Sequence, residues 1–374
     1  MLKTIGFPGR YVQGPGALSQ AGKVLKDLGL RHPLVLADQT VVPRVWPQVE
    51  TGLKAEGFEP VLLNFPGECT EAVIDELAAQ VRAGPADAII ALGGGKTIDT
   101  AKGIARALDL AIVICPTVAS SDAPTSRLIV LYDSTHRLVG VNFTRRNPDA
   151  VIVDTDVIVT APLRFFAAGI GDALSKKFEA RQCAATGGLN SFGTPALGTA
   201  LMLTEALYEK LRVYGPKAYA DVAAGQRTND VEEIVEATVL ISGVGFESGG
   251  LSLAHALLRG LTAIPAMSSM LHGELVAFGT LVQLVVEDRK IEEIEDLLSI
   301  ISAVHLPMTL AELGQTTPLT DEQHRIIAEA TLATNYSKHM TPPLTAERLR
   351  SGLIRSDMLG QAHLSAKYIK QPSK

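Results

Sequence analysis

The chain has 374 residues, of which 47% are hydrophobic and 20% are charged, and its formal net charge is -6. This length favours two domains, and the composition suffices for a large buried core and is unlike that of a disordered chain. A mildly acidic surface argues against a nucleic-acid partner, which would require a basic face.

The sequence predicts a soluble, cytoplasmic protein that has no membrane partner. No apolar run reaches the length needed to span a bilayer, and the N-terminus carries glycine and proline where a signal peptide needs an apolar stretch. The three cysteines, Cys69, Cys115 and Cys183, are odd in number and form no CxxC metal pair. We therefore expect reduced thiols and no disulfide framework.

The first 160 residues alternate short apolar runs with segments of helical periodicity. Residues 70–84, for example, repeat apolar side chains at helical spacing between two apolar runs. Such alternation predicts a parallel sheet with helices on both faces. Four runs are predicted to be buried strands: 34–38, 60–65, 87–92 and 111–116.

The end of this α/β half has a different pattern. Residues 126–143 contain two strand-like runs on either side of the sequence DSTH, which predicts a hairpin. Residues 149–158 predict one last strand. After about residue 162 the strand signals nearly vanish and helical patterns follow one another. We therefore predict an α/β domain over 1–161 and a helical domain over 162–374, with a ligand cleft between them.

The sequence GGGK at residues 93–96 follows a predicted strand and opens a predicted helix. Glycines let a backbone approach a ligand closely, and the free N–H groups at a helix start favour an anion, so the loop suits a diphosphate. The spacing matches neither GxxxxGK[ST] nor GxGxxG. A tight strand–helix turn without any ligand is the alternative, with Thr97 and Asp99 bracing the helix start.

Asp38 ends the first predicted strand and is a candidate ribose ligand. In the standard dinucleotide fold such an acid follows the glycines by about 20 residues, whereas Asp38 precedes them, so the strand order must differ. A carboxylate there accepts hydrogen bonds from a ribose 2′-hydroxyl and repels a 2′-phosphate, which favours NAD over NADP. A turn or cap role for Asp38 is the alternative.

Residues 116–126, PTVASSDAPTS, are rich in small hydroxyl side chains and contain Asp122. This composition is typical of a plain loop and also of a nucleotide groove. In the helical half, Asp172, His255 and His272 are candidate metal ligands, although a histidine in apolar surroundings is more often a core residue. If they converge, one carboxylate and two imidazoles leave a position open, as a catalytic zinc site requires.

Seven motifs occur in order along the chain: LGGGKTIDTAKGIA, PTVASSDAPTS, RNPDAVIVDT, GIGDALSKKFEAR, GFESGGLSLAHA, GLTAIP and HGELVAFGTLVQL. Together they strongly resemble the glycerol dehydrogenases of the iron-containing, metal-dependent alcohol dehydrogenase family. The resemblance runs from residue 9 to about residue 315. It implies an α/β dinucleotide-binding domain, an all-helical C-terminal domain, and a homo-oligomer, often an octamer.

The resemblance also implies roles for individual residues. Zinc would be held by Asp172, His255 and His272, and Asp122 would contact the hydroxyls of the polyol substrate. Asp38 would hold the adenosine ribose of NAD. The remaining cofactor contacts would come from Gly94, Gly95, Lys96, Thr97, Asp99, Thr117, Ser120, Ser126, Leu128 and Tyr132.

Three departures from the family pattern bear on the metal and the substrate. Iron-binding relatives have a fourth ligand, a histidine, four residues after the aspartate, where this chain has Lys176; this favours a three-ligand zinc site, unless Lys176 points into solvent or pairs with Asp172. Leu258 and the stretch 266–271 lack histidines that many glycerol dehydrogenases carry, and Leu275 stands where lysine is frequent. These changes put strict glycerol specificity in question.

The function implied is an NAD- and zinc-dependent polyol dehydrogenase that oxidises glycerol to dihydroxyacetone, with hydride leaving a zinc-bound alkoxide. One alternative is the same chemistry on another vicinal diol, an α-hydroxy ketone or a 2-oxo acid. A lyase similar to dehydroquinate synthase would need a basic pocket, and few basic residues lie near the ligand motifs. A nucleotide-binding protein without catalysis is disfavoured because all three metal ligands are present.

Overall fold

A computed structural model describes residues 1–134 and 137–370. The chain divides into two compact units that are discontinuous in sequence. The α/β unit comprises residues 6–166 and 224–243, and the helical unit comprises 1–5, 167–223 and the chain from 244 onward. Compared with the predicted domains, the α/β unit also contains residues 162–166 and 224–243, and residues 1–5 belong to the helical unit. The predicted boundary at residue 161 stays a prediction.

The α/β unit is built on a parallel six-stranded sheet, as the sequence predicts. The strand order is β1-β8-β5-β4-β2-β3, and β2, β4, β5 and β8 are almost entirely buried because both faces are covered. The strands are β1 (Tyr11–Gly14), β2 (Pro33–Asp38), β3 (Val61–Phe65), β4 (Ala88–Gly93), β5 (Ala111–Pro116) and β8 (Ala150–Asp154).

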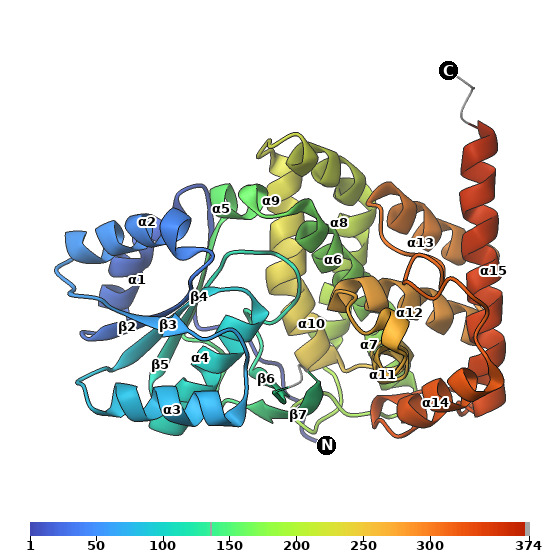
Figure 1. The fold of residues 1–374 in the computed structure, drawn as a ribbon, viewed down its shortest axis with the longest axis horizontal. Coiled ribbons are helices and arrows are strands. Elements are labelled where there is room, and N and C mark those ends of the chain that lie inside the picture. Colours follow the sequence, from blue (N-terminus) through green and yellow to red (C-terminus); the bar gives the residue numbers. More distant parts are fainter. Residues whose placement is uncertain (135–136, 371–374) are drawn as a thin grey trace. The chain divides into compact units, whose positions relative to one another are not determined.

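Helices cover both faces of this sheet. Figure 1 shows α1 and α2 on one face and α3 and α4 on the other. On the first face, aliphatic side chains of α1 and α2 pack on Val35, Ile90 and Val113 in one core. The helices are α1 (Ala21–Asp27), α2 (Val42–Ala55), α3 (Glu71–Arg82) and α4 (Gly95–Leu108).

Two details of the strand predictions need correction. The strand predicted over 149–158 ends at Asp154, because the Asp154 carboxylate accepts a hydrogen bond from Asp156 N and caps α5 (Thr155–Thr160). The edge strand β1, which pairs with β8, was not predicted. The hairpin is present as β6 (Leu128–Tyr132) and β7 (Leu138–Phe143), but its turn includes residues 135 and 136, which lie outside the described residues.

The segment 224–243 contributes α9 (Asn229–Val235) and one π-helical turn, η2 (Glu236–Ile241), to the α/β unit. Thr155 Oγ1 donates to Glu232 Oε1 at 2.6 Å, and Gln13 Nε2 donates to the same carboxylate at 2.9 Å. These bonds fasten α9 to β1 and to the start of α5.

The helical unit has a core formed by α11, α12, α14 and α15. Leu257, Phe278 and Leu353 are fully or almost fully buried in it.

No single helix in the described ranges is long and apolar enough to cross a membrane. One bent pair of segments, 229–249 with 253–262, meets that criterion only when the two are combined. The longer helices from residue 163 on are α6 (Leu163–Leu174), α7 (Lys176–Ala185), α8 (Gly198–Ala223), α10 (Ser242–Gly249), α11 (Leu253–Thr262), α12 (His272–Val286), α13 (Ile291–Ala303), α14 (Asp321–Leu332) and α15 (Ala346–Lys370).

Candidate active site

Asp172, His255 and His272 meet in the helical unit, although a hundred residues of chain separate the first from the last. They come from α6, α11 and the first position of α12, and one ligand atom of each lies within 4.8 Å of the others. Asp172 Oδ1 is 3.4 Å from His255 Nε2 and 3.5 Å from His272 Nε2. Asp172 is fully buried, whereas the His272 side chain is 47% exposed, so this cluster has one open side.

Glycines beside two of these residues allow the close approach. A Cβ on Gly171 would lie 2.3 Å from the carbonyl oxygen of Gly273, and a Cβ on Gly273 would lie 1.7 Å from the carbonyl oxygen of Ala168. The backbones of α6 and α12 are therefore in direct contact, which only glycine permits. Asp172 and His272 are the chain neighbours of these glycines, so the helix crossing brings the two ligand atoms together.

Lys176 is the charge partner of this cluster. Its side chain is completely buried, and its Nζ lies 2.6 Å from Asp172 Oδ1 and 3.2 Å from His255 Nε2. It therefore does not point into solvent. Burial alone would raise the pKa of Asp172, but the Lys176 ammonium and the two imidazoles hold that pKa well below its usual range. Asp172 is ionised, as a metal ligand must be.

Glu179 also belongs to this site, although it was not among the predicted site residues. It is fully buried, and its Oε2 lies 2.5 Å from His255 Nδ1. Asp172, Lys176 and Glu179 are spaced i, i+4, i+7 along α6 and α7, which places them on one side of consecutive helical turns. That spacing of three charged residues was a signal in the sequence that could have pointed to Glu179.

Several residues predicted to bind the cofactor lie at the carboxyl ends of strands of the parallel sheet. Asp38 ends β2, Gly93 ends β4, and Thr117 follows β5, with Thr117 N donating to Gly93 O. Since β3 lies on one side of β2 and β4 on the other, the chain reverses direction across the sheet between β2 and β4. Ligands of open α/β sheets bind at such a switch point, and this strand order explains why Asp38 precedes the glycines in sequence.

The glycine loop leads directly into α4. Gly94 is the N-cap of α4 and, having no side chain, leaves the first N–H groups without a side-chain cap. Lys96 Nζ pairs with Glu68 Oε2 at 2.7 Å and lies 5.0 Å from the centre of the Tyr132 ring. Asp38 forms a local turn, accepting from Thr40 N and Thr40 Oγ1, both at 2.8 Å. An open helix start of this kind favours an anion, and diphosphate binding at this position stays a prediction.

Asp99 and Thr97 lie inside the α/β unit rather than on its surface. Thr97 is buried against Gly93. Asp99 accepts from Val130 N at 3.1 Å and lies 3.6 Å from the buried Nζ of Lys102. Burial raises the pKa of Asp99 to about 6, although Lys102 opposes the shift. These contacts hold α4 against β6, and the role of both residues in cofactor binding stays a prediction.

The loop of residues 117–127, which carries Asp122 and Ser120, is held from three directions. Lys102 Nζ donates to Ala123 O at 2.6 Å and to Leu128 O at 2.8 Å. Thr125 Oγ1 donates to Val239 O in the π-helical turn, and Asn147 Nδ2 donates to Thr125 O. A π-helical turn leaves carbonyls available for such bonds and is frequent at functional sites.

One hydroxyl in this loop has no partner. Ser126 is buried, and its Oγ has no hydrogen-bond partner among the described residues. Of the other predicted groove residues, Thr117 is buried, while Ser120, Leu128 and Tyr132 are half-buried. Buried hydroxyls are usually satisfied, so Ser126 Oγ is an exception, and its role in cofactor binding stays a prediction.

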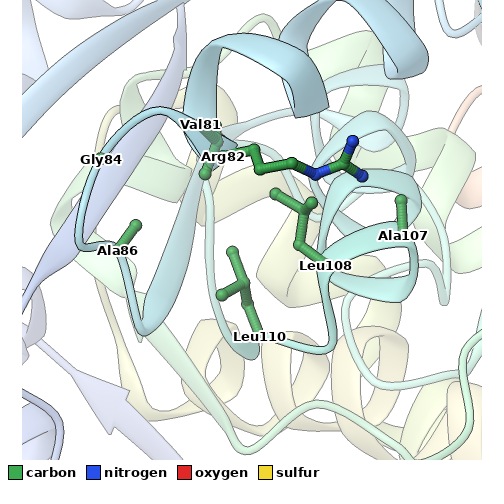
Figure 2. Close-up of a pocket in the computed structure, with 7 residues that line it drawn as sticks. All are labelled: Val81, Arg82, Gly84, Ala86, Ala107, Leu108 and Leu110. Atoms are coloured by element: carbon green, nitrogen blue, oxygen red, sulfur yellow. The ribbon is translucent and has the colours of Figure 1, made fainter.

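A separate cavity of about 350 Å³ lies at the C-terminal ends of α3 and α4, away from the glycine loop at the N-terminus of α4. Figure 2 shows Val81, Leu108 and Leu110 in its wall and the Arg82 side chain reaching toward α4. It contains no carboxylate, imidazole or thiol and none of the residues discussed above. We therefore do not assign it to the active site.

Comparisons with known proteins identify the family. Residues 8–155 match the family model described as iron-containing alcohol dehydrogenase. Over 365 residues the chain is 40% identical to a glycerol dehydrogenase from Escherichia coli, which covers 97% of this chain and 99% of the relative. The chain belongs to the iron-containing alcohol dehydrogenase family. It is an alcohol oxidoreductase.

Two further relatives of this family member are informative. The crystal structure of glycerol dehydrogenase from Schizosaccharomyces pombe superposes with a TM-score of 0.93 at 35% identity and covers 100% of this chain and 95% of that one. A glycolaldehyde reductase from Halobacterium salinarum is 36% identical over 362 residues, or 96% of this chain and 99% of the relative. The predicted family and two-domain fold class are thus confirmed, and the expected cofactors, NAD and a metal ion, agree with the family and with the cluster at Asp172.

Proposed function

We propose that this alcohol oxidoreductase is an NAD- and zinc-dependent polyol dehydrogenase that oxidises glycerol to dihydroxyacetone. The observation that carries the proposal is the convergence of Asp172, His255 and His272 in a chain whose relatives include glycerol dehydrogenases. In the reaction, the hydroxyl proton of C2 passes to solvent and the C2 hydrogen passes as hydride to the nicotinamide. The cytoplasmic location and the homo-oligomer stay predictions.

The residues present fit a metal ion. One carboxylate and two imidazoles are the donor set of open catalytic zinc sites. Asp172 Oδ2 is buried and has no hydrogen-bond partner in the part of the chain that the structure describes, so it is free to accept a bond from outside the protein. Lys176 replaces a fourth ligand, and its ammonium cannot ligate. Three protein ligands without a fourth favour a zinc site over a four-ligand iron site.

Each residue has a defined part in this proposal. Asp172, His255 and His272 would hold the ion, which supplies a Lewis acid that polarises the alcohol oxygen. The N-terminus of α4 would bind the diphosphate of NAD, and Asp38 would accept hydrogen bonds from the adenosine ribose. Asp122, on the loop held by Lys102, would orient the remaining hydroxyls of the polyol.

A second candidate is the same chemistry on a smaller hydroxy-carbonyl compound, in the reducing direction. The glycolaldehyde reductase relative favours it. The structure weakens one argument for altered specificity, however. Leu275 is almost fully buried in the core of the helical unit, and Leu258 packs against the same core, so both apolar side chains have a packing role.

Initial rates on a substrate panel test the proposal. Purified protein would be loaded with zinc and assayed with glycerol, 1,2-propanediol, dihydroxyacetone, glycolaldehyde and 2-oxo acids, each with NAD(H) and NADP(H). We expect the highest kcat/KM with glycerol and NAD in oxidation and with dihydroxyacetone and NADH in reduction. Turnover of glycolaldehyde alone would replace the proposed substrate by the second candidate, and turnover of none would overturn the proposal.

A further inference from the structure

Glu179 is a buried carboxylate that contacts both the backbone and the ring of His255, one of the proposed metal ligands. It is fully buried on α7. Its Oε1 accepts hydrogen bonds from Ser252 N at 2.9 Å and from His255 N at 3.0 Å, and its Oε2 lies 2.5 Å from His255 Nδ1. One side chain thus fixes both the backbone at the start of α11 and the imidazole that α11 carries.

The contacts of His255 determine which ring nitrogen bears the proton. A carboxylate can only accept, so the short contact requires that Nδ1 carries the hydrogen and donates it to Glu179. The lone pair of the neutral ring is then on Nε2, the atom 3.4 Å from Asp172 Oδ1. A metal ion needs that lone pair, so the tautomer selected by Glu179 is the one competent to bind metal.

The imidazoles of His255 and His272 differ in whether the second ring nitrogen is held by another side chain. The His255 side chain is 10% exposed and held on both ring nitrogens, by Glu179 and by Lys176. The His272 side chain is 47% exposed, and its Nδ1 has no hydrogen-bond partner within residues 1–134 and 137–370. A metal-ligating imidazole whose other ring nitrogen donates to a carboxylate is more basic and better oriented than an imidazole without such a partner.

We propose that Glu179 is a positioning residue for the metal site: it fixes the tautomer and the orientation of His255 and so sets the affinity of the site for zinc. The inference rests on the proposed metal-binding function. It assigns to Glu179 no contact with substrate or cofactor.

Competition for zinc with a chromophoric chelator tests this role without any assay of activity. Glu179→Gln has the same shape but removes the charge and forces an N–H donor toward either the His255 ring or the two backbone N–H groups. We expect its zinc affinity to be 10- to 100-fold lower than that of the wild type, the range typical for loss of such partners. The absorption bands of the cobalt-substituted protein should also shift, because the orientation of His255 changes.

Asp154→Asn is the matched control. Asp154 is equally buried and also accepts from backbone N–H groups, those of Gly16, Leu18 and Asp156, but it lies in the α/β unit. The Asp154→Asn variant should have a lower free energy of unfolding than the wild type, with unchanged zinc affinity and an unchanged cobalt spectrum. If Glu179→Gln does not fold, as judged by circular dichroism, Glu179→Asp keeps the charge at a shorter reach and should bind zinc several-fold more weakly than the wild type.

The outcomes separate the two proposals. A wild-type protein that binds no zinc would overturn the proposed function, and the inference with it. A wild type that binds zinc, together with a folded Glu179 variant of equal affinity and unchanged cobalt spectrum, would overturn the inference alone. Equal losses of affinity in Asp154→Asn would show a general effect of stability and would also contradict a positioning role.

Discussion

The Lys176 ammonium lies 2.6 Å from Asp172 Oδ1, and both side chains are completely buried. A buried charge that loses its partner is costly, so each group depends on the other while no metal is bound. A divalent cation at Asp172 would take over part of the charge balance that Lys176 provides. The pair therefore links the stability of the metal-free protein to the metal site.

Lys176→Met should destabilise the metal-free protein far more than the zinc-loaded one. Breaking a buried pair typically costs about 3–5 kcal/mol, and we expect a loss of this order in urea unfolding with excess chelator and a smaller loss with saturating zinc. Lys217→Met removes a similar i,i+4 pair with Asp221 at the surface and should cost at most about 1 kcal/mol in both conditions. Equal losses for Lys176→Met with and without zinc would contradict this account.

Gly171→Ala should weaken zinc binding through geometry alone. The added methyl group would overlap the carbonyl of Gly273 at 2.3 Å, so α6 and α12 must separate and carry Asp172 away from His272. We expect a stability loss of about 1–3 kcal/mol, the usual cost of overpacking, and a clearly lower zinc affinity by chelator competition. Gly215→Ala in α8, where a Cβ meets nothing within 4 Å, is the control and should bind zinc normally. Unchanged affinity in Gly171→Ala would show that the helix contact does not set the site.

Asp38→Ser should relax the preference for NAD. The carboxylate at the end of β2 is the group expected to repel a 2′-phosphate, and serine keeps a hydroxyl for the turn at Thr40. We expect kcat/KM with NADP to rise relative to NAD by about tenfold or more, since 1.4 kcal/mol of removed repulsion corresponds to a factor of ten. A ratio that does not change would remove Asp38 from the cofactor site and leave it with the turn role alone.

Asp99 should make stability depend on pH in the acidic range. Because burial raises its pKa in the folded protein to about 6 from the ordinary value of 3.8, the folded state binds the proton more tightly than the unfolded state between these values. Its contribution is therefore complete below pH 4 and is lost as the pH rises through about 6. Relative to Asp99→Asn, the wild type should lose roughly 3 kcal/mol over this window. Urea unfolding of both proteins at pH 4, 5, 6 and 7 gives the difference, and a constant difference would contradict the assignment.

The sequence was sufficient to predict the parallel sheet, because its central strands are buried on both faces and appear as continuous apolar runs, such as residues 34–38. It was not sufficient for β1, whose four half-buried residues, YVQG, lack the alternation and length of a strand. Nor did it predict where β8 ends, because Asp154 serves both as a strand residue and as a cap.

The buried charged residues were the hardest part of the site to predict. Glu179, Lys102 and Lys176 are fully buried, yet such residues are almost always at the surface unless paired, and their partners come from distant segments. Asp172, His255 and His272 became a convincing set only through the ordered motifs around them. Their residue types alone are equally compatible with isolated core positions.

Removal and return of the metal test the central claim most directly. The protein would be dialysed against a chelator until elemental analysis finds no zinc, and glycerol oxidation with NAD would be measured before and after one equivalent of zinc is restored. The account predicts loss of activity without metal, recovery with zinc in the wild type, and no recovery in Asp172→Asn that is folded by circular dichroism. Full activity in the metal-free wild-type protein would contradict it.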